Sequence, residues 1–387
     1  MKKLLVIHNK YQNIGGEDTS VESEVSILKN IFNTETVYFF NQIPNLFKQA
    51  IYFLLNRNFE SVKKIKKMLE IFDPNIIYVH NTWFKASPAI FNVLLNFNSN
   101  VFLKLHNFRY DCTRYFLTKN HIKSDLYCSK CGLSKDELGY FNKYFTESYL
   151  KSIFINIYGK KYFKVLNKKN LKLLVLTNFH KKYLISLGFN ENRIFVLPNH
   201  LNIESKFTNR VPGDYIVYAG RVSKEKGVQE LIESFLKANT TISELKIIGS
   251  GPILQELQIR YNSDKVSFLG EISNEDVLNI ISNSKGVVTA TKLFEGQPTL
   301  LCEASALGIT SVFPDTGGIK EFFPKDYKYS FIQGNYEDLI EKIKMLENVK
   351  STKEQGVRNG MFLEDLMKHT NLEKFFKQNF KDLGQCD

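Results

Sequence analysis

Short apolar runs alternate with amphipathic stretches along the first two hundred residues. The apolar runs have the length of buried strands, and the stretches between them repeat apolar residues at helical spacing. Strands that alternate with helices in this way form parallel sheets, so the pattern predicts an α/β fold. The predicted strands are Leu4–His8, Thr36–Phe40, Ile76–His80, Val101–His106, Leu171–Thr177 and Arg193–Pro198, and the predicted helices are Val21–Phe32, Glu60–Ile71 and Lys181–Leu187.

A second series of the same kind begins at Tyr215. Its predicted strands are Tyr215–Ala219, Leu245–Ile248, Val266–Phe268, Gly286–Ala290, Thr310–Phe313 and Tyr329–Phe331. Its predicted helices are Lys226–Lys237, Ile253–Tyr261, Asn274–Asn283, one that starts near Pro298-Thr299, Tyr336–Glu347 and Glu373–Phe380.

The two series predict two domains. The polar stretch His200–Gly213 contains Pro212 and reads as the linker. We place the first domain at residues 1–200, the linker at 201–213, the second domain at 214–365 and a closing helix at 366–387. Residues 108–167 break the alternation as a long, aromatic, Lys-rich insertion, which either carries a function or packs on the first domain as a helical elaboration.

Charge separates the two halves of the chain. Residues 1–200 hold 29 Lys+Arg against 14 Asp+Glu, a balance of +15, and residues 201–387 hold 23 against 26, a balance of −3. The basic half indicates either an anionic partner, such as a bilayer surface, a phosphorylated lipid carrier or nucleic acid, or simply a solvated lysine-rich surface.

The remaining composition points to a cytoplasmic chain. No apolar run is long enough to span a bilayer. The start, MKKLLVIHNKYQ, is too short in its apolar part for a signal peptide and reads as a first strand. Five cysteines do not form a disulfide framework.

The segment Phe294–Leu307, FEGQPTLLCEASAL, holds the most informative chemistry. It follows a predicted strand, turns at Gly296-Gln297-Pro298 and starts a helix, whose free N–H groups and dipole favour an anion. Glu295 lies before the turn and Glu303 inside the helix. Carboxylates accept hydrogen bonds from hydroxyls, so a phosphate flanked by hydroxyls, as in a nucleotide sugar, suits this pattern.

Two further loops follow strands of the second series. In GRVSKEKG, Arg221 and Lys226 converge on a helix start and suit a diphosphate. In GSGP, Gly249 and Gly251 permit close approach of a ligand or simply form a turn. Near the N-terminus, Gly15-Gly16-Glu17 follows the first strand without the GxGxxG spacing of a dinucleotide fold.

These residues together resemble the family-4 retaining glycosyltransferases of the GT-B fold, with two Rossmann-like domains facing across a cleft. Glu295, Gly296, Pro298, Glu303, Ala304, Ala306 and Gly308 match the family pattern EGxPxxxxEAxAxG, and Gly317-Gly318 with Glu321 continue it. The pattern departs from the family at Thr310, where a proline is usual, and at Thr291-Lys292, where Pro-Ser is often found. In that fold the terminal helix often crosses back to the first domain.

The resemblance implies a role for each motif. Arg221 and Lys226 would bind the donor diphosphate, Glu303 the ribose and Glu295 the transferred sugar. His106 of HNFR, at a strand end, would contact the same sugar, whereas His80 is read as structural. The implied catalytic residues are His106, Glu295, Arg221 and Lys226, and the implied donor-binding residues are Gly15, Gly16, Gly249, Gly251, Gly296, Gln297, Pro298, Thr299, Leu300 and Glu303.

No metal is expected at the reacting centre, because no DxD motif is present and a helix start with two cations can replace one. Cys128 and Cys131 have zinc spacing, and Cys112 with His121 could complete a structural zinc site, although a second CxxC pair is missing. Cys302 reads as a core residue.

We therefore expect a hexosyltransferase-type retaining enzyme that needs no cofactor and uses a UDP- or GDP-sugar. Its acceptor would be a bacterial cell-surface glycan such as capsule or lipopolysaccharide, or a lipid-linked precursor. It would lie in the cytoplasm or at the inner membrane face and would not bind nucleic acid. The alternatives are a GT-B-like nucleotide-sugar epimerase or hydrolase, and a non-catalytic binder of anionic surfaces or nucleic acid.

Overall fold

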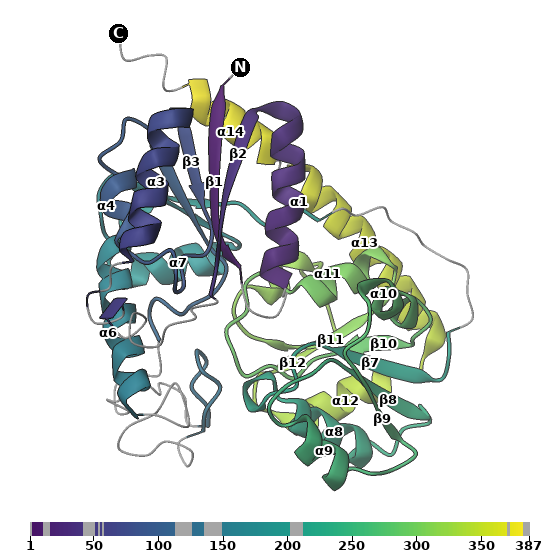
Figure 1. Ribbon diagram of the computed structural model, residues 1–387. Coiled ribbons are helices and arrows are strands. Elements are labelled where there is room, and N and C mark those ends of the chain that lie inside the picture. The colour runs from purple at the N-terminus through teal and green to yellow at the C-terminus, as the bar shows by residue number, and fades with distance from the viewer. Residues whose placement is uncertain are drawn as a thin grey trace. The chain divides into compact units, whose positions relative to one another are not determined.

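The computed structural model describes residues 2–10, 16–41, 51–52, 55, 58–112, 126–134, 149–201, 212–369 and 372–381. The chain divides into two compact units (Figure 1). Unit 1 comprises Met1–Phe116, Phe141–Asn202 and Thr370–Asp387, and unit 2 comprises Leu117–Tyr140 and Ile203–His369. The expected linker at 201–213 lies almost entirely outside the described residues.

Unit 1 contains a parallel sheet of six strands in the order β2-β1-β3-β4-β5-β6. The strands are β1 Lys3–Lys10, β2 Asn33–Phe40, β3 Ile76–Val79, β4 Asn100–Leu105, β5 Leu171–Val175 and β6 Ile194–Val196. The helices are α1 Gly16–Ile31, α3 Phe59–Phe72, α4 Ile90–Leu94, α6 Tyr149–Leu166, α7 Asn178–Ser186 and α14 Leu372–Lys381. The stretch MKKLLVIHNKYQ thus contains β1, as the apolar pattern predicted.

The core of unit 1 lies between its sheet and two helices that are far apart in sequence. Alternate strand residues, among them Leu4, Val6 and Tyr78, pack against α1 and α14. The Phe376 ring of α14 lies 4.9 Å from the ring of Tyr78, and neither side chain is exposed. The last helix of the chain therefore belongs to the core of unit 1, while α3 and α4 lie on the other side of this sheet (Figure 1).

Unit 2 contains a second parallel sheet, in the order β12-β11-β10-β7-β8-β9. The strands are β7 Tyr215–Ala219, β8 Glu244–Ile248, β9 Val266–Gly270, β10 Gly286–Val288, β11 Ser311–Asp315 and β12 Ser330–Ile332. The α-helices are α8 Val228–Lys237, α9 Leu254–Arg260, α10 Asn274–Ser282, α11 Thr299–Ala306, α12 Tyr336–Met345 and α13 Val349–His369. The predicted α/β class with two Rossmann-like units is confirmed.

Two elements of unit 2 differ from what the sequence predicted. The helix expected at Lys226–Lys237 begins at Val228, because Lys224–Lys226 form a 3-10 turn and Gly227 ends it at φ +67°. Helix α13 was not among the predicted helices. Gly356 allows close packing, because a Cβ there would lie 1.9 Å from the carbonyl oxygen of Gly308.

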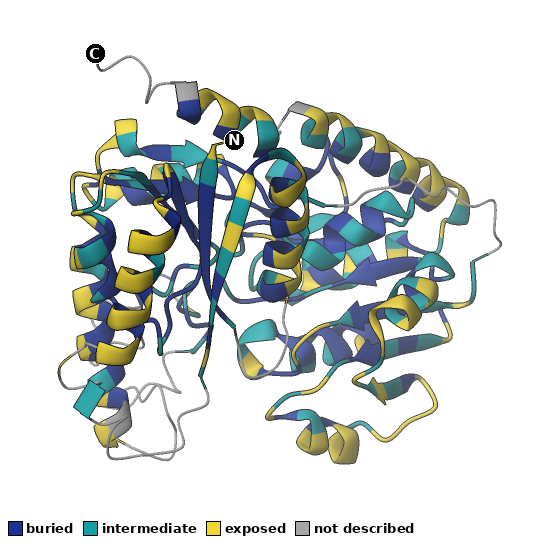
Figure 2. Cartoon of the chain, turned by 45° about the horizontal axis from the view of Figure 1, so that its top comes forward, coloured by how far each residue is buried: buried dark blue, intermediate teal, exposed yellow. Residues whose placement is uncertain are grey.

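Strands and helices differ in burial in the same way in both units. The central strands are buried, the edge strands β2, β9 and β12 are partly exposed, and the helices expose one face (Figure 2). None of the helices within the described ranges is long and apolar enough to cross a membrane.

Candidate active site

Four loops of unit 2 leave the same edge of its sheet. In a parallel sheet the carboxyl ends of all strands share one edge, and β11, β10, β7 and β8 are neighbours. The loops that follow them carry the segments EGQP, GRVSKEKG and GSGP and the pair Gly317-Gly318. Such an edge is where open α/β sheets bind ligands, so the sheet order alone brings these motifs to one place.

Helix α11 begins where the turn after β10 ends. Its first residue is Thr299, and Pro298 precedes it without a side-chain cap. The first hydrogen bond of the helix runs from the N–H of Cys302 to the carbonyl of Pro298 at 3.0 Å. The N–H groups of Thr299, Leu300 and Leu301 are therefore not used within the helix and are available to an anion.

Glu303 lies just over one turn into α11 and is half-buried. Within the described part of the chain, its carboxylate makes no hydrogen bond or ion pair. Burial raises the pKa of this carboxyl to about 7, since desolvation disfavours the charged form. A half-buried carboxylate without a partner is costly for a fold and is characteristic of a binding site.

Glu295 and Lys226 contact each other directly. The Lys226 Nζ atom lies 2.5 Å from Oε1 of Glu295, and both side chains are partly exposed. The same oxygen accepts a hydrogen bond from Oγ1 of Thr291 at 3.0 Å. The two residues were assigned to different parts of the donor, and their contact is a feature that the sequence did not indicate.

The backbone of Glu295 is held by the glycine pair after β11. The N–H of Gly318 donates to the Glu295 carbonyl at 2.8 Å. Gly317 has φ +58°, and a Cβ there would lie 2.3 Å from the same carbonyl oxygen. Only glycine fits this close approach, which gives a physical reason for the Gly-Gly spacing.

Glycines also fix the loops after β7 and β8 against their neighbours. A Cβ on Gly227 would lie 2.0 Å from the Ala290 carbonyl oxygen, and one on Gly249 would lie 2.1 Å from that of Gly220. A Cβ on Gly251 would lie 2.1 Å from the carbonyl oxygen of Val222. These glycines therefore have structural roles at the edge, whether or not a ligand approaches them.

Arg221 follows β7 in the loop that Gly220 begins. Its side chain is exposed and makes no hydrogen bond or ion pair with any residue in the described ranges. Its backbone is anchored, because the hydroxyl of Tyr218 donates to the Arg221 carbonyl at 2.9 Å. An anchored backbone with an unpaired guanidinium can reach an anion without first breaking another contact.

In unit 1, Gly16 is the first residue of α1, and Gly15 lies outside the described residues. His106 follows β4 and is half-buried. Its Nε2 atom lies 3.1 Å from Nδ1 of His80, and the two rings stack with centroids 5.4 Å apart. Burial lowers the pKa of both imidazoles well below the ordinary value, so both rings are neutral at physiological pH.

Sequence reasoning missed the buried ion pair beside these histidines. Nζ of Lys104 lies 2.5 Å from Oε1 of Glu24, and both side chains are fully buried. Oε2 of Glu24 accepts from the Tyr78 hydroxyl at 2.7 Å, and it lies 3.9 Å from Nε2 of His80. The position of Lys104 inside an otherwise apolar strand was the one feature of the sequence that indicated a buried charge. Because Glu24 is distant in sequence, the pair itself could not be foreseen.

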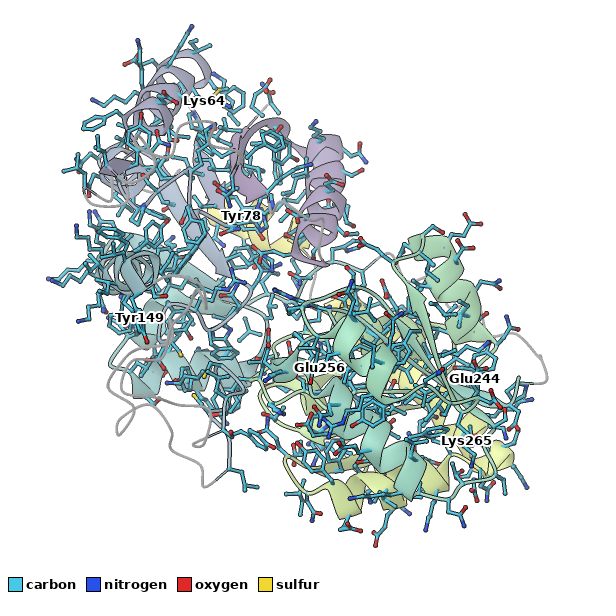
Figure 3. The ribbon with its side chains drawn as sticks, turned by 60° about the horizontal axis from the view of Figure 1, so that its bottom comes forward. Lys64, Tyr78, Tyr149, Glu244, Glu256 and Lys265 are labelled. Carbon is cyan, nitrogen blue, oxygen red and sulfur yellow. The ribbon has the colours of Figure 1, made fainter. Side chains whose placement is uncertain are left out.

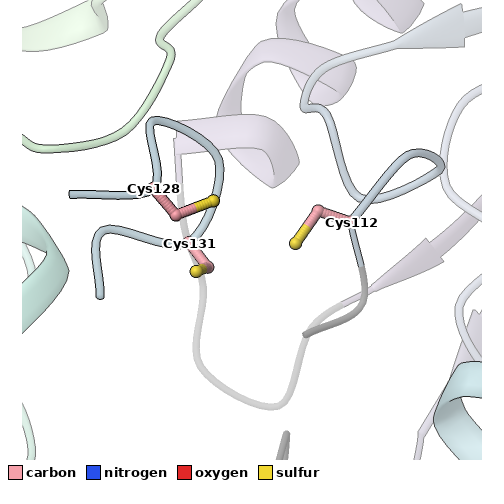
Figure 4. A group of neighbouring side chains, drawn as sticks. All are labelled: Cys112, Cys128 and Cys131. Atoms are coloured by element: carbon pink, nitrogen blue, oxygen red, sulfur yellow. The ribbon is translucent and has the colours of Figure 1, made fainter. Parts of the chain in front are cut away.

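Three cysteines of the insertion lie close together. The sulfur atoms of Cys112, Cys128 and Cys131 are all within 4.8 Å of one another, and each residue is buried (Figure 4). They could hold a metal ion. His121, which could complete the ligand set by its sequence position, lies outside the described residues. Cys302 is buried in α11, as expected for a core residue.

Comparison with known proteins concerns mainly unit 2. Residues 202–360 match the family described as glycosyl transferases group 1. Over 201 residues the chain is 26% identical to the capsular polysaccharide biosynthesis glycosyltransferase CapM of Staphylococcus aureus. The aligned region covers 48% of this chain and 52% of CapM. The chain thus matches about half the length of this curated relative.

Solved structures resemble the whole chain. Sucrose-phosphate synthase from Thermosynechococcus elongatus has a TM-score of 0.71 at 15% identity, with 100% of both chains covered. Anabaena Alr3699/HepE, solved in complex with UDP and glucose, has a TM-score of 0.65 at 13% identity, with 99% of this chain and 100% of that chain covered. At this identity the likeness concerns the fold, and it confirms the GT-B class.

Proposed function

We propose that this protein is a retaining, hexosyltransferase-type glycosyltransferase. It moves a sugar from a UDP- or GDP-sugar to a cell-surface glycan or a lipid-linked acceptor. The observation that carries the proposal is the half-buried Glu303 carboxylate, which has no partner among the described residues and lies in α11 just after the N–H groups of Thr299–Leu301 that the helix does not use. The match of residues 202–360 to group 1 glycosyltransferases covers this site, and CapM and HepE supply the polysaccharide and UDP chemistry by analogy.

The charges of the site suit departure of a nucleoside diphosphate. Arg221 and Lys226 would neutralise the charge that develops on the leaving diphosphate, together with the N–H groups of Thr299–Leu301. The ionised Glu303 would accept hydrogen bonds from the ribose hydroxyls, and Glu295 would accept them from the transferred sugar. No side chain is assigned as a nucleophile. The acceptor hydroxyl would attack from the same face, and an oxygen of the leaving diphosphate would take its proton.

The family resemblance assigns His106 of unit 1 to the transferred sugar, and we include this role in the proposal. Its neutral ring fits that role, because a neutral imidazole can donate or accept a hydrogen bond without adding charge. No cofactor is proposed. Two cations and a helix start would supply the electrostatic stabilisation that a divalent cation gives elsewhere.

The test is a screen of UDP- and GDP-sugars for thermal stabilisation, followed by turnover with candidate acceptors. Stabilisation by one nucleotide sugar, with transfer and retained anomeric configuration, would support the proposal. Turnover of that sugar without an acceptor would favour an epimerase or hydrolase. Strongly salt-dependent binding to anionic polymers, with no nucleotide-sugar affinity, would favour a non-catalytic binder.

We also propose that unit 1 contacts an anionic bilayer from the cytoplasmic side. On α3, Lys63, Lys64, Lys66 and Lys67 are exposed beside Ile71, which is 71% exposed. Figure 3 labels Lys64 on this helix. Lysines beside exposed apolar side chains suit an anionic lipid surface.

Helix α6 carries the same combination. Its first half exposes Leu150 at 69% and Ile153 at 39%, and the exposed residues Lys160, Lys161 and Lys164 follow. Sedimentation with vesicles of phosphatidylglycerol should retain the protein at low salt, and vesicles of phosphatidylcholine should not. Equal binding to both kinds of vesicle, or to neither, would contradict this proposal.

A further inference from the structure

We propose that Cys112, Cys128 and Cys131 bind a zinc ion that has a structural role. The inference starts from the turn Cys128-Ser129-Lys130-Cys131-Gly132, which is a C-x-x-C-G sequence. Two thiolates at this spacing on a tight turn can point to the same side and share one metal ion.

The backbone of this turn is closed by its own hydrogen bonds. The N–H of Gly132 donates to the Cys128 carbonyl at 2.7 Å, and the N–H of Cys128 donates to the Leu133 carbonyl at 2.8 Å. Tyr127 and Ser134 form an antiparallel bridge just outside them. The sequence thus folds into a small hairpin that presents both cysteines from one loop.

Gly132 shows that the turn has a required geometry. Its φ is +68°, a conformation that glycine adopts at little cost. A Cβ at this position would also lie 2.7 Å from Cβ of Glu225. The glycine directly after the second cysteine is therefore needed twice, once for the turn and once for its packing.

Cys112 supplies the third sulfur from a second turn. Its N–H group donates to the Phe108 carbonyl at 3.4 Å, so the residue closes the turn that follows His106-Asn107. The three cysteines are 8%, 2% and 7% exposed, and Figure 4 shows their side chains turned toward a common space.

The spacing of the sulfurs fits a metal better than a disulfide. With zinc–sulfur bonds of about 2.3 Å, two ligands of a tetrahedral site lie about 3.8 Å apart. The three sulfurs, all within 4.8 Å of one another, therefore need only small shifts to bind one ion. A disulfide would use two of the three and leave a buried thiol beside it, whereas zinc uses all three and compensates their charge.

The hairpin supports the loops of the candidate active site in unit 2. The N–H of Phe294, next to Glu295, donates to the carbonyl of Ser129. Gly132 packs on Glu225, next to Lys226, and Nζ of Lys292 lies 4.3 Å from the Tyr127 ring centre. A metal in the hairpin would hold the backbone on either side of the Lys226–Glu295 pair. This consequence rests on the proposed function, but the metal site itself does not.

The test measures metal in the full-length chain, after removal of any affinity tag, by elemental analysis. We expect about one zinc ion per chain and its loss in Cys112→Ser, Cys128→Ser and Cys131→Ser. Cys302→Ala is the matched control, because it removes a buried thiol elsewhere and should keep the metal. Replacement by cobalt in the wild-type protein should give thiolate-to-cobalt charge-transfer absorption, which remains a test even if the serine variants do not fold.

Two results would overturn the site. One is a wild-type chain purified with zinc in the medium that carries no more metal than Cys128→Ser and binds no cobalt through thiolates. The other is a loss of two titratable thiols in the unfolded, unreduced protein, which would show a disulfide. Neither measurement involves a nucleotide sugar, so failure of the metal site and failure of the proposed activity are separate results.

Discussion

Replacing Glu303 by glutamine should stabilise the ligand-free protein while it weakens donor binding. The carboxyl has an ordinary pKa of 4.5 that burial raises to about 7. Between these two values the native state holds a proton that the unfolded chain has lost. Native stability therefore falls as pH rises through this window, and the full cost is present above pH 7. A difference of this size amounts to about 3 kcal/mol.

Glutamine has the same shape and does not titrate, so Glu303→Gln removes this cost. The free energy of unfolding of the variant, relative to wild type, should rise by about 3 kcal/mol between pH 4.5 and pH 8. For a unit of this size the melting temperature should shift by roughly 6–12 °C over that range. Any cost of burying the amide is independent of pH and cancels in the comparison.

The assay is urea unfolding of the full-length protein, followed at a series of pH values without ligand. The control is Glu256→Gln, since Glu256 is exposed on α9 (Figure 3). The control difference should stay flat across the series. A Glu303→Gln difference that is equally flat would refute the desolvation argument.

The same variant tests the role of the carboxylate. An ionised acceptor of hydroxyl hydrogen bonds contributes about 1.5–3 kcal/mol, so affinity for UDP or GDP and for the nucleotide sugar should both fall about tenfold to hundredfold. Wild-type affinity should itself fall as pH drops below about 7, when the carboxyl becomes protonated. Unchanged affinity for both ligands would remove Glu303 from the ribose.

Four other outcomes are expected. Arg221→Ala or Lys226→Ala should weaken donor binding by about 1.5–3 kcal/mol without unfolding the chain, and calorimetric titration that finds wild-type affinity in both would contradict a phosphate role. Glu295→Gln should leave binding of the free nucleoside diphosphate intact, or tighten it up to about fivefold because Lys226 loses its partner, while turnover falls; loss of diphosphate binding would reverse the assignment. EDTA should leave initial rates unchanged, and an activity that returns only with magnesium or manganese would show a catalytic divalent cation. Gly227→Ala should lower the melting temperature, because its Cβ would clash with the Ala290 carbonyl at a positive φ, and an unchanged melting curve would argue against that contact.

The sequence predicted most strands because their apolar runs are continuous and local. Where it failed, contacts between distant segments decided the structure. Helix α13 contains Gly356, which propensity alone counts as a breaker, yet that glycine packs on Gly308. The 3-10 turn before α8 likewise depends on the approach of Gly227 to Ala290, which no local pattern contains.

The sequence predicted which residues form the candidate site, but it did not predict which of them contact each other. Motif spacing located Glu295, Glu303, Arg221 and Lys226, and the sheet order brought their loops to one edge. The contact between Lys226 and Glu295 joins residues 69 positions apart, so only the fold reveals it. The Glu24–Lys104 pair and the His80–His106 stack escaped prediction for the same reason.

Backbone contacts hold the loops at the carboxyl edge of the unit 2 sheet, and this explains how charged side chains in these loops can stay unpaired. Gly227, Gly249, Gly251 and Gly317 fix the loops by contacts between backbones, which need no side chain. Arg221 and the Glu303 carboxylate can therefore stay without a partner among the residues that the structure describes, although burial of Glu303 carries a cost. A fold that relied on these charges for its own stability would have to break those pairs before binding a ligand. Because backbone contacts support the loops and side chains recognise the ligand, that step is not needed. We therefore expect substitutions of the glycines to lower stability, whereas substitutions of Arg221 or Glu303 should weaken binding without lowering stability.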